Sequence, residues 1–370
     1  MTETPDPAAA AGAEDAQFSR ALNELLAEFF AAERERVSQI SQDAPRLVDS
    51  IERLTSGGKR LRARLSYWGW RAAGGETLAP AMVRAAASLE LFQSAALIHD
   101  DILDRSDTRR GQPSVHRDFE RVHTQQGWRD DAAHFGISAA VLTGDMSLSF
   151  AEQLFAQAST LLPRDYERAG RAIFDTMRTE VMVGQYLDVH AEVAPTPEDP
   201  EEQLTRAMAV LRYKSAKYSV EHPVRIGAAL AGTDEDFLAH CSAFALPVGE
   251  AFQLRDDVLG VFGNPETTGK PAGDDIREGK RTALVALCAK GGSAEDIEWL
   301  DSTLGRSDLT EDEIQRARTL METSGALGHT EDLIGELVTT ADHQLATLPT
   351  NEVARAGLRA LADAAVRRSR

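Results

Sequence analysis

The sequence has little cysteine, fewer basic than acidic side chains, and no long apolar run. Its two cysteines, Cys241 and Cys288, lie in separate apolar stretches and give neither a disulfide framework nor a metal-ligand spacing, which favours a reducing compartment. The 370 residues contain 40 Lys and Arg against 59 Asp and Glu, and a formal net charge of −19 disfavours binding to nucleic acid. Because an apolar run of about 18 residues and a secretory signal are both lacking, we expect a cytoplasmic protein with no integral membrane segment.

Alternation of apolar and polar residues, the pattern of a half-buried strand, is hard to find. From Phe18 nearly to the end, apolar residues instead recur at intervals of three and four, which predicts an all-α fold. Residues 1–17 carry little to bury and are expected to form a disordered tail, while residues 18–370 form a large single domain. A domain of this size favours a homodimer. Helices are expected near residues 18–40, 59–73, 80–105, 134–160, 165–190, 203–230, 234–261, 281–290, 311–323, 331–345 and 351–367.

The segment from Pro80 to about Arg105 is the longest without an internal break. Pro80 suits a first helical position, and hardly any polar face exists between Ala85 and Ile98. A helix that is apolar on most sides belongs inside a bundle, surrounded by other helices. We therefore expect this segment to be the central helix.

Three carboxylates end this predicted helix. Asp100 and Asp104 are four residues apart and share a face, whereas Asp101 is turned about 100° away. Acids at a helix C-terminus oppose the macrodipole unless a cation lies between them, and hard oxygen ligands too few for a closed cage suit Mg²⁺. A second acidic pair, Asp256 and Asp257, lies on another apolar helix. The alternative for the first group is a solvated acidic helix end.

Basic residues gather at glycine turns and beside the acidic pairs. In a chain of net charge −19, such cations indicate a bound anion, and the planar guanidinium of Arg suits phosphate oxygens. We infer a diphosphate, although each cluster alone would also fit a solvated surface. The clusters are Gly57-Gly58-Lys59-Arg60-Leu61-Arg62, Arg109-Arg110, Lys214 with Lys217, and Gly269-Lys270.

In order and spacing, these motifs resemble the trans-isoprenyl diphosphate synthases, the polyprenyl synthetase family. The resemblance rests on GGKRLR, LIHDDILD with DTRRGQPSVH, GQYLD, Lys214-Ser215, FQLRDDVLG, and GKPAGDD with REGK, between Gly57 and Thr282. It implies a helical bundle of the isoprenoid synthase type around a central apolar cavity. It also implies Mg²⁺-dependent, head-to-tail condensation of isopentenyl diphosphate with an allylic diphosphate, namely dimethylallyl, geranyl or farnesyl diphosphate.

The resemblance also implies roles for individual residues. Asp100 and Asp104 would bind Mg²⁺ ions that bridge the allylic diphosphate, and Asp256 would hold another. Isopentenyl diphosphate would be bound by Lys59, Arg62, Gln93 and Arg110. The allylic leaving group would be bound by Arg109, Lys214 and Lys270. Further substrate-binding residues would be Gln253 and Ser215, and Ser215 stands where the family often has Thr. One departure is Gly260, which stands where the second acidic motif usually has a third Asp.

Product length is expected to depend on the residues upstream of Asp100. Ala95 and Ala96 stand where a bulky aromatic commonly stops chain growth in the family, and the next large side chain is Phe92, about 12 Å along the helix. This favours geranylgeranyl diphosphate (C20) over farnesyl diphosphate (C15). Two alternatives stay open. A terpene cyclase of the same architecture is disfavoured by the paired basic motifs, and a weakly active regulatory subunit is suggested only by Gly260.

Overall fold

The structure is a computed structural model that describes residues 6–263, 273–306 and 308–367. Within these residues the fold is helical, with one pair of two-residue strands, so the predicted all-α class is confirmed. The chain divides into two compact units, which are described separately, and the single domain with its central apolar cavity stays a prediction. Unit 1 comprises Met1–Gly170, Ile226–Asp234 and Thr350–Leu358, and unit 2 comprises Arg171–Arg225, Glu235–Pro349 and Arg359–Arg370.

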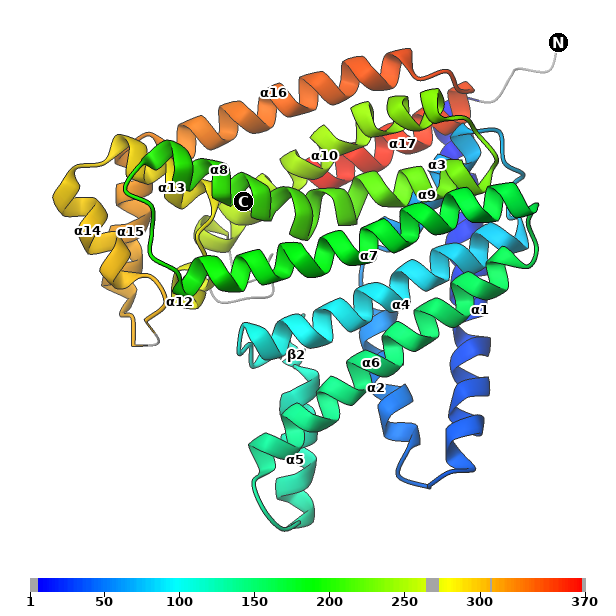
Figure 1. Cartoon of the computed structure of the whole chain (residues 1–370), viewed down its shortest axis with the longest axis horizontal. Helices are drawn as coiled ribbons and strands as arrows, with labels where there is room; N and C mark the ends of the chain where they lie inside the picture. Colours follow the sequence, from blue (N-terminus) through cyan, green and yellow to red (C-terminus); the bar gives the residue numbers. More distant parts are fainter. Residues whose placement is uncertain (1–5, 264–272, 307, 368–370) are drawn as a thin grey trace. The chain divides into compact units, whose positions relative to one another are not determined.

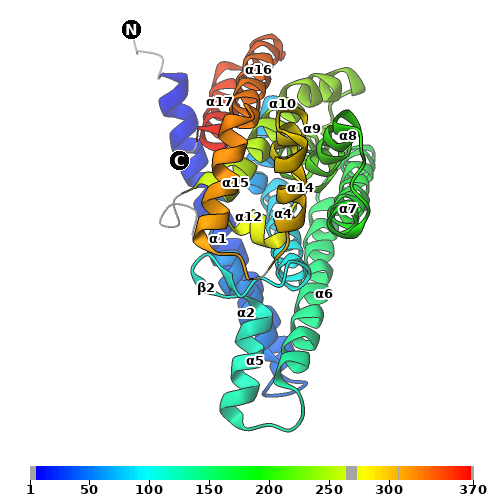
Figure 2. The same cartoon turned by 90° about the vertical axis from the view of Figure 1, so that its left-hand side faces the viewer.

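Unit 1 is built around one central helix (Figure 1). Proline at the first or second position begins α1, α2 and α4, where its missing N–H would have no helical partner. Figures 1 and 2 both show α5 alongside α6, and the two helices pack closely. The elements are α1 (Pro7–Ser38), α2 (Pro45–Ser56), α3 (Leu61–Ala72), α4 (Pro80–Leu103), β1 (Thr108–Arg109), β2 (Gln112–Pro113), α5 (Val115–Gln126) and α6 (Ala132–Ser159).

Helix α4 is the predicted central helix. It packs against α1, α2, α3, α5 and α6. By length and composition it could cross a membrane, but 78% of its apolar window is buried inside the protein. The Ser147 hydroxyl of α6 donates a hydrogen bond of 2.7 Å to the Leu91 carbonyl, which fixes these two helices together. The burial identifies α4 as a core helix.

The N-terminal segment differs from the expectation. Helix α1 begins at Pro7, so the predicted disordered tail is wrong from that residue onward. The Glu14 carboxylate accepts a hydrogen bond of 2.6 Å from the Tyr67 hydroxyl, and Asp15 accepts one of 3.0 Å from the Trp68 indole. These acids are ordered by α3, which lies about 50 residues further along the chain. Composition alone cannot reveal partners so far away in the sequence.

Four helices were not expected either, namely α2, α5, α12 (Asp274–Glu278) and α14 (Ala294–Thr303). In α5, the polar stretch hides an amphipathic pattern in which Val115, Phe119 and Val122 are buried. In α2, Val48 and Ile51 are buried in the same way. Each of these helices has only a few apolar residues, four at most in α2 and α14, and they did not stand out among the polar and charged ones.

Unit 2 contains η1, a π-helical segment within the stretch predicted as one helix over 203–230. Gly249 of α10 allows the close approach to η1, because a Cβ there would overlap the backbone of Ala216. Helices α7 (Arg164–Val193), α9 (His222–Leu230) and α17 (Glu352–Val366) contribute residues to both units. The other elements are α8 (Pro200–Val210), η1 (Leu211–Glu221), α10 (Glu235–Phe262), α12 (Asp274–Glu278), α13 (Ala283–Gly291), α14 (Ala294–Thr303), α15 (Glu311–Thr323) and α16 (Ala326–Thr347).

Candidate functional site

The first acidic cluster lies at the C-terminal end of α4, in unit 1. Arg109 Nε donates a hydrogen bond of 2.8 Å to Asp101 Oδ1, and its Nη2 lies 3.2 Å from Asp100 Oδ2. Asp101 is only 1% exposed, whereas Asp100 is half-buried, and Asp104 caps the helix. The middle carboxylate therefore anchors Arg109, and the outer two keep accessible surface.

Electrostatics explains why Arg109 stays charged in this position. Burial lowers the pKa of its guanidinium, but the negative charges of Asp101, Asp100 and Asp104 outweigh burial, and the pKa of Arg109 is raised. The family resemblance implies a role for Arg109 only at the leaving group. The structure places it against the acids, where it compensates part of their charge.

A tight hairpin separates the two adjacent arginines. Strands β1 and β2 are antiparallel, with Arg109 opposite Gln112. The two residues between them, Arg110 and Gly111, both have positive φ angles (54° and 72°), as a type I′ turn requires. Residues next to each other in an extended strand and turn point in different directions. Arg109 reaches the carboxylates, and Arg110 reaches the glycine-rich loop before α3.

The glycine pair at 57 and 58 makes room for Arg110. Its Nη1 donates hydrogen bonds to the carbonyls of Leu54 (3.1 Å) and Gly57. A Cβ at Gly57 would lie 2.8 Å from that Nη1, and one at Gly58 would lie 2.9 Å from Nη2. Gly58 also has φ +115°, which L side chains rarely adopt. Gly58 is therefore favoured by its backbone conformation, and a side chain at position 57 would displace the Arg110 guanidinium from this contact.

The arginines of unit 1 form a concentrated positive site. Burial lowers the pKa of Arg110. The positive charges of Arg109, Arg60 and Arg62 lower it further. Cations held this close repel one another unless an anion lies between them. The arrangement is suited to a phosphate-bearing ligand.

Glu90 of α4 holds the junction between the glycine-rich loop, which carries Lys59, and α3, which carries Arg62. Its carboxylate accepts hydrogen bonds of 3.3 Å from Arg60 Nη1 and from the Ala63 backbone N–H in the first turn of α3. Glu90 is itself buried. Gln93 lies one turn further along α4 and is half-buried. The four residues predicted to bind isopentenyl diphosphate thus lie on elements that pack together. The sequence did not reveal Glu90 as a residue of this site, because it acts by binding the first turn of α3.

The three product-length residues occupy different surroundings on α4. Phe92 is 2% exposed and Ala95 is fully buried. Ala96 is half-buried and lies one turn before Asp100, on the same face of the helix. Of the three, Ala96 keeps surface on the side of the Asp100 carboxylate.

The second acidic cluster lies in unit 2, on α10. The Gln253 amide donates a hydrogen bond of 2.8 Å to Asp257 Oδ1. Burial raises the pKa of Asp257 to about 8, and the charges of Asp275 and Asp256 act in the same direction. Gln253, predicted to bind substrate, therefore contacts the acidic motif itself. Asp256 is half-buried.

A third carboxylate reaches this cluster from α12. A Cβ on Gly260 would lie 2.8 Å from Asp275 Oδ1 and closer still to Oδ2 and Cγ. Lys280 Nζ lies 3.8 Å from Asp275 Oδ1 and also pairs with Glu278. Asp275 is the last residue of the GKPAGDD motif, but the family resemblance implied no role for it.

The GQYLD motif holds the lysine segment of unit 2 in place. Gly184 of α7 allows close contact with η1, because a Cβ there would overlap the Lys214 backbone. One turn later, Asp188 is buried and pairs with Lys214 Nζ. Ser215, next to Lys214, is half-buried. The motif thus positions Lys214 by packing and by charge.

A polar network extends from α7 to η1 and to His222 at the start of α9. Glu180 of α7 accepts a hydrogen bond of 2.8 Å from Lys217 Nζ and lies 2.7 Å from His222 Nε2. His222 is 1% exposed, and burial lowers its pKa although Glu180 acts in the opposite direction. π-Helical segments are frequent at functional sites, and η1 carries Lys214 and Lys217 together.

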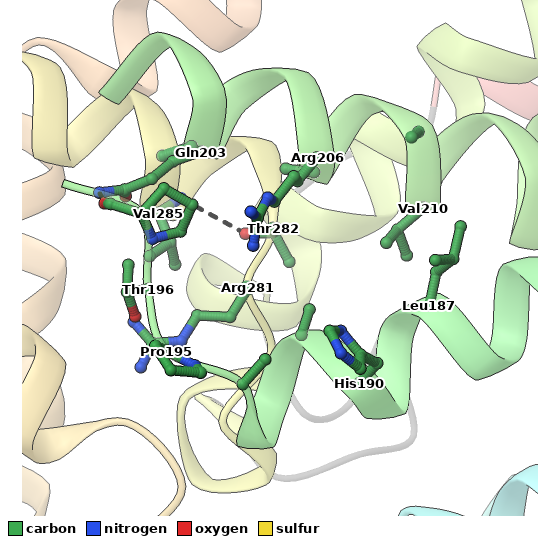
Figure 3. Close-up of a pocket in the computed structure, with 16 residues that line it drawn as sticks. Leu187, His190, Pro195, Thr196, Gln203, Arg206, Val210, Arg281, Thr282 and Val285 are labelled. Carbon is green, nitrogen blue, oxygen red and sulfur yellow. Dashed lines mark hydrogen bonds between the residues drawn. The ribbon is translucent and has the colours of Figure 1, made fainter. Parts of the chain in front are cut away.

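A separate cavity of about 270 Å³ lies within unit 2. Its lining residues are drawn in Figure 3. It is formed by the C-terminal part of α7, residues 195–197, α8 and the start of α13. Two of its arginines already have partners, since Arg206 pairs with Glu202 and Arg281 with Asp301. None of the predicted site residues belongs to its described lining.

Two points concern the predicted metal and phosphate ligands. Lys270 lies outside the described residues. Among the residues that the structure does describe, no three His, Cys, Asp or Glu side chains form a metal-binding group. Mg²⁺ keeps several waters and needs only one or two carboxylates together with substrate phosphates, so the hard oxygen donors of the two acidic clusters suit this ion.

Comparison with known proteins identifies the class. A sequence model of the polyprenyl synthetase family matches residues 44–321, and the chain belongs to this family. The resemblance seen in the sequence is thus confirmed. The protein is a prenyltransferase of the kind that makes prenyl diphosphates, as its relatives also indicate.

Individual relatives carry different product names. The chain is 31% identical over 302 residues to a geranylfarnesyl diphosphate synthase from Aeropyrum pernix, covering 81% of this chain and 86% of that one. It is 32% identical over 274 residues to a (2E,6E)-farnesyl diphosphate synthase from Mycobacterium bovis, covering 72% and 68%. A crystal structure of geranylgeranyl pyrophosphate synthase from Corynebacterium glutamicum, complexed with isoprenyl diphosphate and magnesium, is 36% identical with a TM-score of 0.88, covering 95% and 99%.

Proposed function

We propose that the protein condenses isopentenyl diphosphate head to tail with an allylic diphosphate, namely dimethylallyl, geranyl or farnesyl diphosphate, in a Mg²⁺-dependent reaction. The observation that carries this proposal is the hairpin of unit 1. One arginine, Arg109, lies on the acidic cluster, and the next, Arg110, lies in the glycine-rich basic loop. A single turn thereby connects an acidic site with a basic site, as an enzyme that binds two diphosphates requires.

On the allylic side, Asp100, Asp104 and Asp256 would hold Mg²⁺. When bound, the metal neutralises diphosphate oxygens and so stabilises the leaving group. Arg109, Lys214 and Lys270 add positive charge to that group as the C–O bond breaks. Asp101 and Asp188 keep Arg109 and Lys214 in position. Preorganised charge of this kind acts where negative charge develops.

On the other side, Lys59, Arg62, Gln93 and Arg110 bind isopentenyl diphosphate. Its alkene attacks the allylic carbocation, a C–C bond forms, and a proton is lost to the released pyrophosphate. Apolar surface of α4 near Ala96 and Leu97 excludes water from the cation. Ser215 and Gln253 support the allylic site through the neighbouring Lys214 and Asp257.

The proposed main product is geranylgeranyl diphosphate (C20). Support comes from Ala96, the half-buried small residue on the Asp100 face, and from Phe92 further along α4. A small residue lets the chain pass one turn from the acids, and a buried aromatic limits it further on. The names of the relatives span several lengths, so they support the reaction more strongly than the length.

We further propose a cytoplasmic homodimer. Helix α6 exposes Ile137, Val141 and Leu142, with exposed fractions of 42%, 40% and 61%. These residues lie on neighbouring turns and form an apolar face that a second copy would cover. A monomeric mass in solution, measured by light scattering, would contradict the dimer.

Substrate omission tests the proposed reaction. The purified protein is incubated with the allylic diphosphate alone, with isopentenyl diphosphate alone, and with both. Elongation only with both substrates is expected. Hydrocarbon formed from the allylic diphosphate alone would indicate a terpene cyclase instead, and no turnover without an added partner would indicate a regulatory subunit.

Substitutions along α4 test the product length. Ala96→Phe is expected to shorten the main product, since it places a bulky ring one turn from Asp100. Phe92→Ala is expected to lengthen it, because it removes the next large side chain. Chromatography of the dephosphorylated products measures both effects. An unchanged product distribution in both active variants would show that the growing chain does not follow this helix.

A further inference from the structure

Gly260 is the one position at which the second acidic motif lacks an expected carboxylate. It lies one turn after Asp256 on α10, so a side chain there would share the Asp256 face. The structure shows that this space is occupied. The Asp275 carboxylate of α12 lies where the side chain of residue 260 would begin, and even a methyl group at Gly260 would overlap it.

Several contacts fix the position of Asp275. Helix α12 has left-handed glycines at both ends, Gly273 (φ 78°) and Gly279 (φ 81°). Ile276, next to Asp275, is 1% exposed and belongs to the apolar core of this region. The Asp275 carbonyl accepts hydrogen bonds from the N–H groups of Gly279 (3.1 Å) and Lys280 (3.0 Å). The backbone around Asp275 is thus held on both sides, and its side chain points to α10.

We propose that Asp275 supplies the third carboxylate of the second acidic cluster, in the place that a side chain at position 260 would take. This inference rests on the proposed Mg²⁺-dependent function and assigns one more of its metal-binding groups. Asp256 and Asp275 then face the diphosphate from two different elements, α10 and α12. Their oxygens are the hard ligands that Mg²⁺ prefers.

Gly260 leaves the space that the Asp275 carboxylate occupies. Glycine weakens a helix interior, so its presence inside α10 needs a structural reason. The reason is the carboxylate that enters from α12. A carboxylate at position 260 and one at position 275 cannot both occupy this space. We therefore expect that the carboxylate can be supplied from either position, but not from both.

Metal binding without turnover tests the role of Asp275. Mn²⁺ binding to the full chain is measured by electron paramagnetic resonance in the presence of inorganic pyrophosphate. Asp275→Asn is expected to weaken Mn²⁺ binding at least about tenfold. The matched control is Asp274→Asn, which removes the same charge from the neighbouring position and is expected to change binding less than twofold. Equal effects of the two variants would overturn the proposal.

Transposing the carboxylate tests the exchange. Asp275→Ala and Gly260→Asp are each expected to weaken Mn²⁺ binding, the first by removing the ligand and the second by overlap. The double variant Gly260→Asp/Asp275→Ala is expected to recover affinity to within about threefold of the wild type. A double variant no better than Asp275→Ala overturns the exchange. A Tm in chelator within a few degrees of that of the wild type excludes misfolding of a variant as the cause. Gly260→Ala provides a second test of the overlap that adds no charge.

The wild type distinguishes this inference from the proposed function. If it elongates prenyl chains with Mg²⁺ but Asp275→Asn binds Mn²⁺ normally, only the role of Asp275 is wrong. If the wild type neither binds Mn²⁺ with pyrophosphate nor elongates a substrate, both are wrong.

Discussion

The two acidic clusters use the same pair of adjacent aspartates in different ways. In the first, the inner carboxylate of Asp101 is buried against the guanidinium of Arg109, so the protein supplies a cation of its own. In the second, the inner carboxyl of Asp257 is buried against the neutral amide of Gln253, and its pKa is raised to about 8. Similar local sequences thus give a charged anchor in one unit and a hydrogen-bonded acid in the other.

The difference follows from the elements that each motif meets. A hairpin with two positive-φ residues brings Arg109 back onto α4 nine residues after Asp100. On α10, the neighbouring element is α12, which brings a further carboxylate and Lys280. The charge state of the inner aspartate of each pair therefore depends on the side chain that it contacts, and not on its spacing in the sequence.

The largest expected effect is on the outer aspartates of the first cluster. Asp100→Ala or Asp104→Ala is expected to reduce kcat by about a hundredfold or more, because each removes an oxygen ligand on the diphosphate side. Steady-state rates with Mg²⁺ measure the effect, and circular dichroism checks that the helices are retained. Near-normal rates in either variant would contradict the metal assignment.

The inner aspartates should differ in stability. Asp101→Asn is expected to cost about 3 kcal/mol in the free energy of unfolding, because it removes the buried carboxylate that the guanidinium of Arg109 contacts most closely. Asp257→Asn is expected to cost less than about 1 kcal/mol, since an amide can still bond the neutral Gln253. Denaturant unfolding of both variants at one pH measures the difference. Equal losses would remove the distinction between the two clusters.

Substrate affinities should separate the basic groups of the two units. Arg62→Ala is expected to raise KM for isopentenyl diphosphate. The loss of binding free energy is expected to be about 1.5–3 kcal/mol, the strength of a hydrogen bond to a charged group. Lys214→Ala is expected to act mainly on the allylic substrate. Kinetics with each substrate varied in turn measure both, and a parallel rise in both KM values for both variants would contradict the division.

The smallest expected effect concerns His222. Because burial lowers its pKa, the unfolded chain binds its proton more tightly, and stability falls as the pH drops below about 6.5. One group contributes a slope of at most about 1.4 kcal/mol per pH unit. His222→Gln is expected to flatten the curve between pH 5 and 7, and the exposed His240→Gln is the control. Identical curves for wild type and His222→Gln would exclude this contribution.

Sequence alone could locate the central helix and most of the polar residues, because motifs and helical periodicity are local properties. It could place Arg109 and Arg110 in one motif, but not show that a type I′ turn sends them to different sites. It could note that Gly260 lacks a carboxylate, but not that Asp275 fills the space. Contacts between distant segments, such as those of Glu14 with α3, carry no signal in a single sequence.

Product analysis of the wild-type chain tests the proposed reaction and the proposed product length together. The purified wild-type chain is incubated with farnesyl diphosphate, isopentenyl diphosphate and Mg²⁺, and the products are dephosphorylated and separated by chain length. We predict one main C20 product that disappears when a chelator is added. No product longer than the starter, or the same product in the presence of chelator, would contradict the account.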